Sequence, residues 1–356
     1  MNSLETPIAI IDAEPFERNL ARLAQFARKS GVRLRPHAKS HKCSEVAQQQ
    51  IKLGAVGVCC QALGEASAMV EGGVRDVLIT NMVVTPGKLT AIAALARRAR
   101  VGLCFDDEEQ VRRAGKIFTA DGAKVDAYIE IEVGSERCGV ESPDNAVALA
   151  RIITEYPSLE LKGLQAYHGK SQHMRSRSER LAAARSTGDK SQAVKAALAA
   201  AGFEIERITG AGTGSFAADA KIGVLDEWQC GSYAFMDRDY GENEPDDPKF
   251  EHSLFIVATV ISLRDGFAVI DAGLKALSFD SGLPTVAGRP DLSYFGPNDE
   301  HGRIDVSKAR TPLKIGDQVH LIPGHCDPTL AMHDEIALLR HGRIETMWHV
   351  DGRGPR

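Results

Sequence analysis

Short runs of β-branched and apolar residues alternate with helical stretches over the first two thirds of the chain. Eight of these runs are typical of strands, and most of them precede a segment with helical periodicity. The predicted strands are 32–37, 55–60, 76–80, 101–105, 125–133, 161–167, 205–210 and 227–233. An opening strand and helix, 8–12 and 15–29, precede this series.

Eight strand–helix units in this length match the size of a (β/α)₈ barrel, known as a TIM barrel. A doubly wound open sheet is the alternative, because a strand count cannot prove closure. We therefore expect an α/β fold built on a barrel.

The pattern changes from about residue 250, where helical periods become rare. Strands separated by Gly, Asp and Pro turns are predicted at 253–263, 267–271, 318–322, 335–339 and 343–348. The acidic, Pro-containing segment 242–249 is typical of a linker. We predict a barrel domain over 13–245 and a mostly β domain formed by 1–12 together with 246–356.

Composition narrows the class of protein. The chain has 356 residues, of which 43% are hydrophobic and 26% charged, the balance of a soluble globular protein of roughly two domains. A net charge of −5 gives no electrostatic reason to bind nucleic acid or an anionic membrane. Seven cysteines without repeated Cys-x-x-Cys pairs, no signal-peptide pattern and no long apolar run indicate a cytoplasmic protein with reduced thiols.

The residues able to do chemistry gather where predicted barrel strands end, which is where barrel enzymes hold their active sites. They fall at 35–42, at Gln61, at 134–139, at 167–173, at 210–215 and at 231–233. This shared position in the repeating unit indicates one site built from several loops.

The glycine-rich loop Gly210–Ser215 is the clearest candidate anion site. Glycines allow backbone N–H groups to approach a phosphate, and Thr213 and Ser215 add hydroxyls. In barrels, phosphate is often held by the loops after the last two strands, here Gly210–Ser215 and Gly231–Tyr233. A glycine-rich turn without a ligand is the alternative.

A lysine at the end of the first barrel strand complements a phosphate loop. Pyridoxal phosphate needs a lysine for a Schiff base and a separate phosphate cradle. Lys39 lies among His37, His41 and Lys42, whose positive charge is expected to lower the pKa of its amine. A solvated basic loop is the alternative.

A candidate metal pair lies in the predicted β domain. His325 and Asp327 are two residues apart on a segment expected to be extended, so both side chains can point the same way and Cys326 faces away. Imidazole plus carboxylate suits Mn²⁺, Mg²⁺ or Zn²⁺. A turn with a capped histidine is the alternative.

Seven motifs, in order along nearly the whole chain, carry a family resemblance. They are Pro-His-Ala-Lys-Ser-His-Lys at 36–42, Val-Gly-Ser-Glu-Arg-Cys-Gly at 133–139, Gln-Ala-Tyr-His-Gly-Lys-Ser-Gln-His at 165–173, Gly-Thr-Gly-Ser at 212–215, Gly-Ser-Tyr-x-Phe-Met-Asp at 231–237, Asp-Ala-Gly-x-Lys-Ala at 271–276 and Pro-Gly-His-Cys-Asp-Pro-Thr at 323–329. The chain resembles the D-threonine aldolase and D-serine dehydratase family, which are alanine-racemase-type pyridoxal phosphate enzymes.

The resemblance implies a homodimer of a pyridoxal phosphate barrel plus a β domain, with a divalent metal. It implies Lys39 as the Schiff-base residue, Arg137 beside the cofactor's phenolic oxygen, Tyr167 near its pyridine nitrogen and His173 near the substrate hydroxyl, with Lys39 and His173 catalytic. The expected cofactor contacts are Lys39, Gln61, Arg137, Tyr167, Gly212, Thr213, Gly214, Ser215, Gly231, Ser232 and Tyr233, and the expected metal ligands are His325 and Asp327.

One position separates branches of this family. By this resemblance, the dehydratases carry a His-x-Cys metal pair, a soft ligand set that selects zinc. The pair His325-x-Asp327 is instead similar to the metal pair of the aldolases. We therefore expect an aldolase that uses pyridoxal phosphate and a divalent metal, Mn²⁺ or Mg²⁺ before Zn²⁺. It would cleave D-β-hydroxy-α-amino acids, D-threonine or 3-hydroxy-D-aspartate, to glycine and an aldehyde or glyoxylate.

Two alternatives remain. One is a dehydratase of D-serine or 3-hydroxyaspartate, in which the metal helps hydroxide to leave. The other is a pyridoxal phosphate homeostasis protein that only binds the cofactor; such proteins resemble the barrel alone, so the β domain and the metal pair argue against it. The expected partner in either enzyme reading is a small amino-acid substrate, without nucleic acid or membrane.

Overall fold

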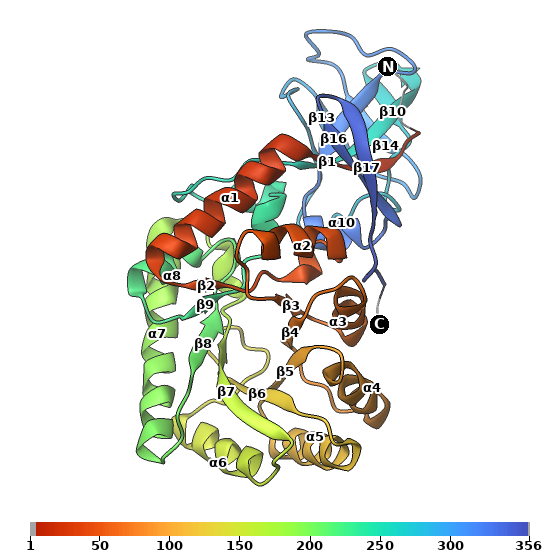
Figure 1. The fold of residues 1–356 in the computed structure, drawn as a ribbon. Helices are drawn as coiled ribbons and strands as arrows, with labels where there is room; N and C mark the ends of the chain where they lie inside the picture. Colours follow the sequence, from red (N-terminus) through yellow and green to blue (C-terminus); the bar gives the residue numbers. More distant parts are fainter. Residues whose placement is uncertain (1–4, 355–356) are drawn as a thin grey trace.

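The structure is a computed structural model that describes residues 5–354, and its strands form two separate sheets (Figure 1). One sheet has eight strands and carries helices on its outer side; the other has nine strands and lies at one end of the first. Within residues 5–354, no helix is both long and apolar enough to cross a membrane.

The eight-stranded sheet is entirely parallel and has the order β2-β9-β8-β7-β6-β5-β4-β3. Its strands are β2 (Arg33–Leu34), β3 (Val58–Cys60), β4 (Asp76–Ile79), β5 (Arg100–Phe105), β6 (Val125–Glu130), β7 (Leu159–Ala166), β8 (Arg207–Gly210) and β9 (Glu227–Trp228). A parallel bridge between His37 and Cys59 joins the two ends of this order. The sheet is therefore closed into a barrel, which excludes the open doubly wound alternative.

Helices follow most barrel strands and cover the outside of the barrel (Figure 1). Helix α1 (Ala13–Ser30) precedes the first barrel strand, and the helices that follow barrel strands are α2 (Ser44–Lys52), α3 (Leu63–Glu71), α4 (Pro86–Ala96), α5 (Glu108–Asp121), α6 (Pro143–Thr154), α7 (Arg177–Ala200) and α8 (Phe216–Ile222). Helix α1 shows why the sequence folds this way. Asp12 accepts the N–H of Glu14 at its start, and Gly31, in the left-handed conformation, ends it. Its buried residues include Phe16, Leu20 and Leu23.

The nine-stranded sheet combines the start of the chain with its last third. Its order is β11-β14-β13-β12-β15-β10-β1-β16-β17. The strands are β1 (Ile8–Asp12), β10 (Leu254–Arg264), β11 (Phe267–Ile270), β12 (Thr285–Val286), β13 (Ser293–Phe295), β14 (Gly302–Asp305), β15 (Gln318–Ile322), β16 (Glu335–Arg340) and β17 (Arg343–His349). β1 pairs antiparallel with β10 and parallel with β16. This pairing supports the predicted grouping of 1–12 with 246–356, although residues 1–4 and 355–356 lie outside the described part, and the domain limits remain a prediction.

Three short strands and two helices go beyond what the sequence pattern predicted. β12, β13 and β14 contain two to four residues each, too few to show an alternation. The segment after β8 forms the short helix α8 instead of a connector. Residues Cys326–Leu330 form helix α10, where an extended segment was expected.

Candidate active site

The lysine turn follows β2 and contacts the loop after β9. Lys39 lies in a short 3₁₀ helix, Ala38–Ser40, and its backbone N–H donates to His37 Nδ1 at 3.3 Å. A Cβ atom on Gly231 would lie 2.7 Å from the carbonyl oxygen of His37, so only glycine permits this approach. The loops after the first and last barrel strands therefore touch at the lysine.

Asp327 connects this lysine to the β domain. Its Oδ2 atom lies 3.3 Å from Lys39 Nζ, and its Oδ1 atom lies 3.8 Å from His325 Nε2. Ser232, in the loop after β9, donates its hydroxyl to Asp327 Oδ1 at 3.5 Å. The structure thus brings together four of the predicted site residues from three loops.

The pKa of Lys39 is shifted upward, whereas the sequence analysis expected it to be lowered. The carboxylate of Asp327 raises the pKa of Lys39 above its ordinary value, in spite of desolvation, which acts to lower it. Burial lowers the pKa of His37 well below its ordinary value and that of His41 to about 4, so neither ring is positive at neutral pH. Lys42 pairs with Glu65. The prediction that neighbouring positive charges lower the pKa of Lys39 is therefore wrong.

The carboxylate of Asp327 is correspondingly stabilised in its charged form. Burial acts to raise its pKa, but the positive charges of Lys39 and His325 outweigh burial and lower the pKa to about 2. A permanently ionised carboxylate beside an amine and an imidazole is suited to hold a cation.

The metal pair lies at the start of a helix, which corrects the extended segment expected from the sequence. Helix α10 begins at Cys326, and its first backbone N–H donates to Asp237 Oδ2 at 3.0 Å. Asp237 also accepts the N–H of Tyr240 with its other oxygen, at 3.0 Å. One buried carboxylate therefore caps α10 and the short helix α9 (Arg238–Gly241), and so joins the β domain to the barrel.

His325 is held at both ring nitrogens. Its Nδ1 atom lies 2.7 Å from Asp280 Oδ2, and its Nε2 atom faces Asp327. Desolvation acts to lower the pKa of His325, but Asp327 and Asp280 raise it above the ordinary value. Asp280 thus occupies Nδ1, and Nε2 is the ring nitrogen that faces Asp327.

Cys326 contacts the metal pair from the interior of the protein. It is fully buried, and its thiol donates to Asp327 Oδ1 at 3.3 Å instead of facing away as expected. Burial raises the pKa of this thiol well above its ordinary value, so the thiolate needed for metal binding is disfavoured. The carboxylate at 327 is therefore the better ligand.

The donor set fits a divalent ion held by two protein ligands. Within residues 5–354, no three His, Cys, Asp or Glu side chains are grouped so that they could hold a metal without other ligands. An imidazole nitrogen and an ionised carboxylate leave further coordination positions to water or substrate, as in catalytic metal sites. The pair thus suits a metal that acts on a substrate.

The predicted phosphate loop is shaped by Gln172. A Cβ atom on Gly212 would lie 2.4 Å from Gln172 Oε1, and one on Gly214 would lie 2.4 Å from the carbonyl oxygen of Gln172. Gly214 donates its N–H to Gln172 Oε1 at 2.9 Å, and Gly212 donates to Ser215 Oγ at 3.2 Å. These bonds fix the loop and occupy the N–H groups of Gly212 and Gly214, so the approach of these two N–H groups to a phosphate, expected from the sequence, is not seen in this structure.

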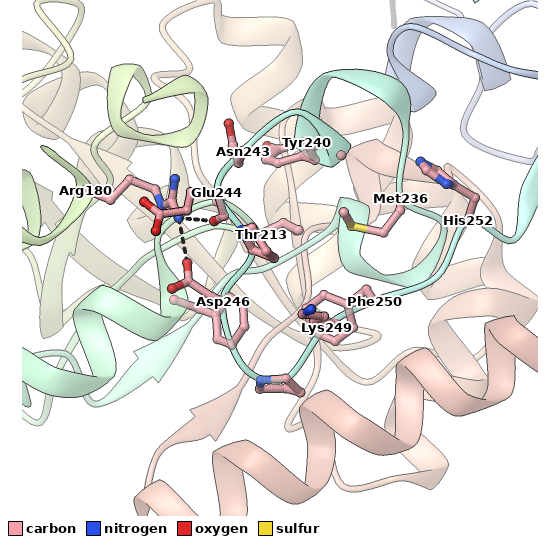
Figure 2. Close-up of a pocket in the computed structure, with 15 residues that line it drawn as sticks. Arg180, Thr213, Met236, Tyr240, Asn243, Glu244, Asp246, Lys249, Phe250 and His252 are labelled. Atoms are coloured by element: carbon pink, nitrogen blue, oxygen red, sulfur yellow. Dashed lines mark hydrogen bonds and ion pairs between the residues drawn. The ribbon is translucent and has the colours of Figure 1, made fainter. Parts of the chain in front are cut away.

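A cavity borders this loop at Thr213 and Gly214, as Figure 2 shows. Its wall is completed by Phe216, by residues of 236–252 and by Arg180 of α7. The buried guanidinium of Arg180 donates to the carbonyl of Glu244 at 2.6 Å and to Asp246 at 2.9 Å, which fixes the segment predicted to be a linker. Lys39 and the metal pair are not part of this wall.

Tyr233 faces the protein interior at both of its polar groups. Its backbone N–H donates to Thr213 Oγ1 at 3.0 Å, and its hydroxyl accepts from Gln50 Nε2 at 3.3 Å. Burial raises the pKa of this phenol. Tyr233 therefore connects the two predicted phosphate loops, and its role as a cofactor contact remains a prediction.

Arg137 and Tyr167 meet at the ends of β6 and β7. The Arg137 guanidinium lies 5.9 Å from the centre of the Tyr167 ring and 3.6 Å from Glu130 Oε1. Burial raises the pKa of Glu130 to about 7, against the lowering effect of Arg137. Gln61, after β3, accepts the hydroxyl of Thr80 at 3.5 Å. These three predicted contacts lie at the carboxyl ends of barrel strands.

His173 forms a dyad with a carboxylate that the sequence analysis missed. Its Nδ1 atom lies 2.5 Å from Asp239 Oδ2, and its ring centre lies 5.9 Å from that of Tyr240. Asp239 is two residues beyond Asp237, the last residue of a quoted motif, which is the only local signal for it. Asp280 carries no sequence signal that we can identify.

Together these groups fit pyridoxal phosphate. A primary amine, a tightly turned glycine loop that borders a cavity, and a cation beside a tyrosine all follow the carboxyl ends of barrel strands. Those are the groups that such a cofactor requires.

Comparison with known proteins places the chain in a family. Residues 11–239 match the model for the alanine racemase N-terminal domain, and residues 253–339 match a putative serine dehydratase domain. The chain belongs to the alanine racemase-like family. The predicted family and the predicted barrel-plus-β-domain fold are thereby confirmed.

Within the alanine racemase-like family, the chain is similar to several aldolases over its whole length. It is 41% identical over 353 residues to D-threonine aldolase of Arthrobacter sp., covering 99% of this chain and 93% of that protein. It is 40% identical over 362 residues to 3-hydroxy-D-aspartate aldolase of Paracoccus denitrificans strain Pd 1222, with the same coverage. The crystal structure of D-threonine aldolase from Filomicrobium marinum matches it with a TM-score of 0.97 and 46% identity, over 99% of this chain and 96% of that one.

Proposed function

We propose that the protein is an aldolase that uses pyridoxal phosphate and a divalent metal to cleave D-β-hydroxy-α-amino acids to glycine and an aldehyde or glyoxylate. Its substrates would be D-threonine or 3-hydroxy-D-aspartate. The observation that carries the proposal is the position of Asp327, 3.3 Å from Lys39 and 3.8 Å from His325. Because Asp327 contacts both side chains, a metal held by His325 and Asp327 would lie close to the amine of Lys39.

The chain offers residues for each part of the cofactor. Lys39 would hold it covalently, the loops Gly212–Ser215 and Gly231–Tyr233 would border its phosphate, and Arg137, Tyr167 and Gln61 would face its ring. When bound, pyridoxal phosphate supplies an electron sink for the pair released as a bond to Cα breaks. His325 and Asp327 would hold the metal, which supplies Lewis acidity toward the β-hydroxyl.

His173 is the group suited to move the substrate's proton. Asp239 accepts the Nδ1–H of His173, so Nε2 is free to accept the proton of the β-hydroxyl. Loss of that proton lets the Cα–Cβ bond break, with the carbonyl of the leaving aldehyde forming in its place. Asp239 then stabilises the positive charge on the ring.

A substrate panel tests this proposal. The purified protein, with pyridoxal phosphate and Mn²⁺, would be incubated separately with D-threonine, L-threonine, D-serine and both 3-hydroxyaspartate diastereomers. We expect glycine from D-threonine or from one hydroxyaspartate diastereomer, and none from L-threonine. Glycine from L-threonine at an equal rate would contradict the stereochemical assignment.

The second candidate is a dehydratase of D-serine or 3-hydroxyaspartate. The match of residues 253–339 to a putative serine dehydratase domain favours it. The carboxylate at 327 and the buried, protonated thiol of Cys326 count against it, because a soft zinc-selecting pair would need a thiolate.

A further inference from the structure

Asp280 contacts the ring nitrogen of His325 that points away from Asp327. It lies in the segment after β11, and its Oδ2 atom is 2.7 Å from His325 Nδ1. Neither sequence motif nor family model singles out this residue, and the proposed reaction does not use it directly.

Asp280 is itself held in place by two hydroxyls. Ser278 donates to Asp280 Oδ1 at 2.7 Å, and Ser281 donates to Oδ2 at 3.1 Å. Both oxygens accept from these hydroxyls, and Oδ2 also faces the imidazole, so Asp280 acts as an acceptor toward His325 Nδ1.

The segment that carries Asp280 is also tied to the helix that follows His325. Ser278 donates its backbone N–H to Thr329 Oγ1 at 3.1 Å, and the Thr329 hydroxyl donates to the carbonyl of His325 at 2.7 Å. These hydrogen bonds through Thr329 hold the backbone next to Asp280 and the backbone of His325 in fixed positions relative to each other.

We propose that Asp280 is a positioning residue that holds the proton of His325 on Nδ1 and so presents Nε2 to the divalent ion beside Asp327. This inference rests on the proposed function, because it assumes that His325 binds a metal. Carboxylates that bond to a ligating histidine orient the ring and raise its basicity, and their loss typically weakens metal binding by about 10- to 100-fold.

If Asp280 served only stability, its removal would lower the stability of the fold. The Asp280 side chain is 49% exposed, and an exposed pair of this kind contributes little to stability. Removing it should therefore leave folding and cofactor binding unchanged while metal affinity falls.

Measurement of Mn²⁺ affinity tests the inference without using activity. The full-length enzyme, treated with chelator and saturated with pyridoxal phosphate, would be titrated with Mn²⁺ while free Mn²⁺ is followed by electron paramagnetic resonance. The variants are Asp280→Ala, Asp280→Asn, His325→Ala and, as a matched control, Asp334→Ala. Asp334 directly precedes β16, is 74% exposed and forms its ion pair with Arg353, away from His325.

We expect the Mn²⁺ dissociation constant of Asp280→Ala to rise about 10- to 100-fold. Asp280→Asn retains an acceptor oxygen and should show a smaller rise, and Asp334→Ala should match the unmodified enzyme. The cofactor absorbance and the thermal midpoint of the metal-free protein should be the same in all four proteins with an intact His325.

The outcomes separate this inference from the proposed function. A dissociation constant for Asp280→Ala within twofold of the unmodified enzyme, with binding lost in His325→Ala, overturns the inference and leaves the metal site standing. Equal Mn²⁺ binding by His325→Ala and the unmodified enzyme overturns both. A parallel loss of cofactor absorbance and thermal midpoint in Asp280→Asn would assign Asp280 a structural role instead.

Discussion

His173 Nδ1 lies 2.5 Å from Asp239 Oδ2, and Arg175 binds the other oxygen of the same carboxylate, also at 2.5 Å. Burial acts to raise the pKa of Asp239, but these two bonds outweigh it and lower the pKa to about 2. Asp239 is therefore ionised at neutral pH and acts as an acceptor toward Nδ1 of the imidazole. In the proposed function, this relation leaves Nε2 of His173 to accept the substrate's proton.

Replacement of Asp239 by Asn tests that role. An amide cannot stabilise a positive imidazole, so we expect kcat/KM for D-threonine to fall by about 100-fold or more. Cofactor absorbance should not change. Glu242→Gln is the matched control, because Glu242 also contacts Arg175, at 3.4 Å, but does not contact His173. Equal losses in the two variants would assign the effect to Arg175 and not to the dyad.

The glycine loop predicts a strong dependence of cofactor binding on Gly214. A valine there would place its Cβ atom 2.4 Å from the carbonyl oxygen of Gln172 and push the loop from its position. We expect Gly214→Val to weaken pyridoxal phosphate binding, measured by titration of the visible absorbance. Gly87→Ala is the control, because a Cβ at Gly87 meets no atom within 4 Å. Unchanged cofactor affinity in Gly214→Val would show that the loop is only a turn.

Borohydride reduction tests the lysine assignment. Reduction should fix the cofactor on the peptide that contains Lys39, and Lys39→Ala should abolish the labelling. Lys42→Ala should leave it intact, because Lys42 is paired with Glu65 and not with Asp327. Label found on the Lys42 or Lys170 peptide would contradict the assignment.

Substitutions at the metal pair should change metal preference without removing the cofactor. Asp327→Ala should abolish glycine release, since one imidazole rarely holds a hard ion alone. Asp327→Cys should shift preference from Mn²⁺ toward Zn²⁺ because a thiolate is a soft ligand. Cys326→Ala should keep the original preference, since the buried thiol of Cys326 stays protonated. An Mn²⁺ preference retained by Asp327→Cys would contradict the ligand assignment.

Asp219, in α8 behind the glycine loop, should make stability depend on pH. Burial raises its pKa from 3.8 to about 7, with Ser215 acting in the opposite direction. The folded protein then binds this proton more tightly than the unfolded chain, so the contribution of Asp219 to stability falls as pH rises from about 4 to about 7.

Asp219→Asn removes this dependence. The variant should gain stability over the unmodified protein between pH 4 and pH 7, by up to about 4 kcal/mol, and the gain should be constant above that range. Urea unfolding at pH 5 and pH 8 measures the difference, with Asp189→Asn, an exposed helix position, as control. A gain that is equal at both pH values would contradict the burial argument.

The barrel could be predicted because its signals are local. Each strand is a short apolar run, and helix ends such as Asp12 and Gly31 are marked by residues that cap within a few positions. The glycine loop and Lys39 were found because they follow such strands. Closure through His37 and Cys59 could not be predicted, because it joins two ends of the sheet.

The rest of the site depends on contacts between distant parts of the chain. Helix α10 was missed because its cap is Asp237, 89 residues earlier in the chain. The direction of the pKa shift of Lys39 was predicted wrongly because Asp327, in helix α10, approaches Lys39 from a distant part of the chain. Asp239 and Asp280 act through single hydrogen bonds to histidines, and no spacing in the sequence reveals such bonds.

The products formed from D-threonine test the central claim most directly. One sample of the purified protein with pyridoxal phosphate, Mn²⁺ and D-threonine would be analysed for both possible pairs of products. An aldolase gives glycine and acetaldehyde in equal amounts, and the account predicts this result. Formation of 2-oxobutanoate and ammonia without glycine would contradict it and would identify a dehydratase.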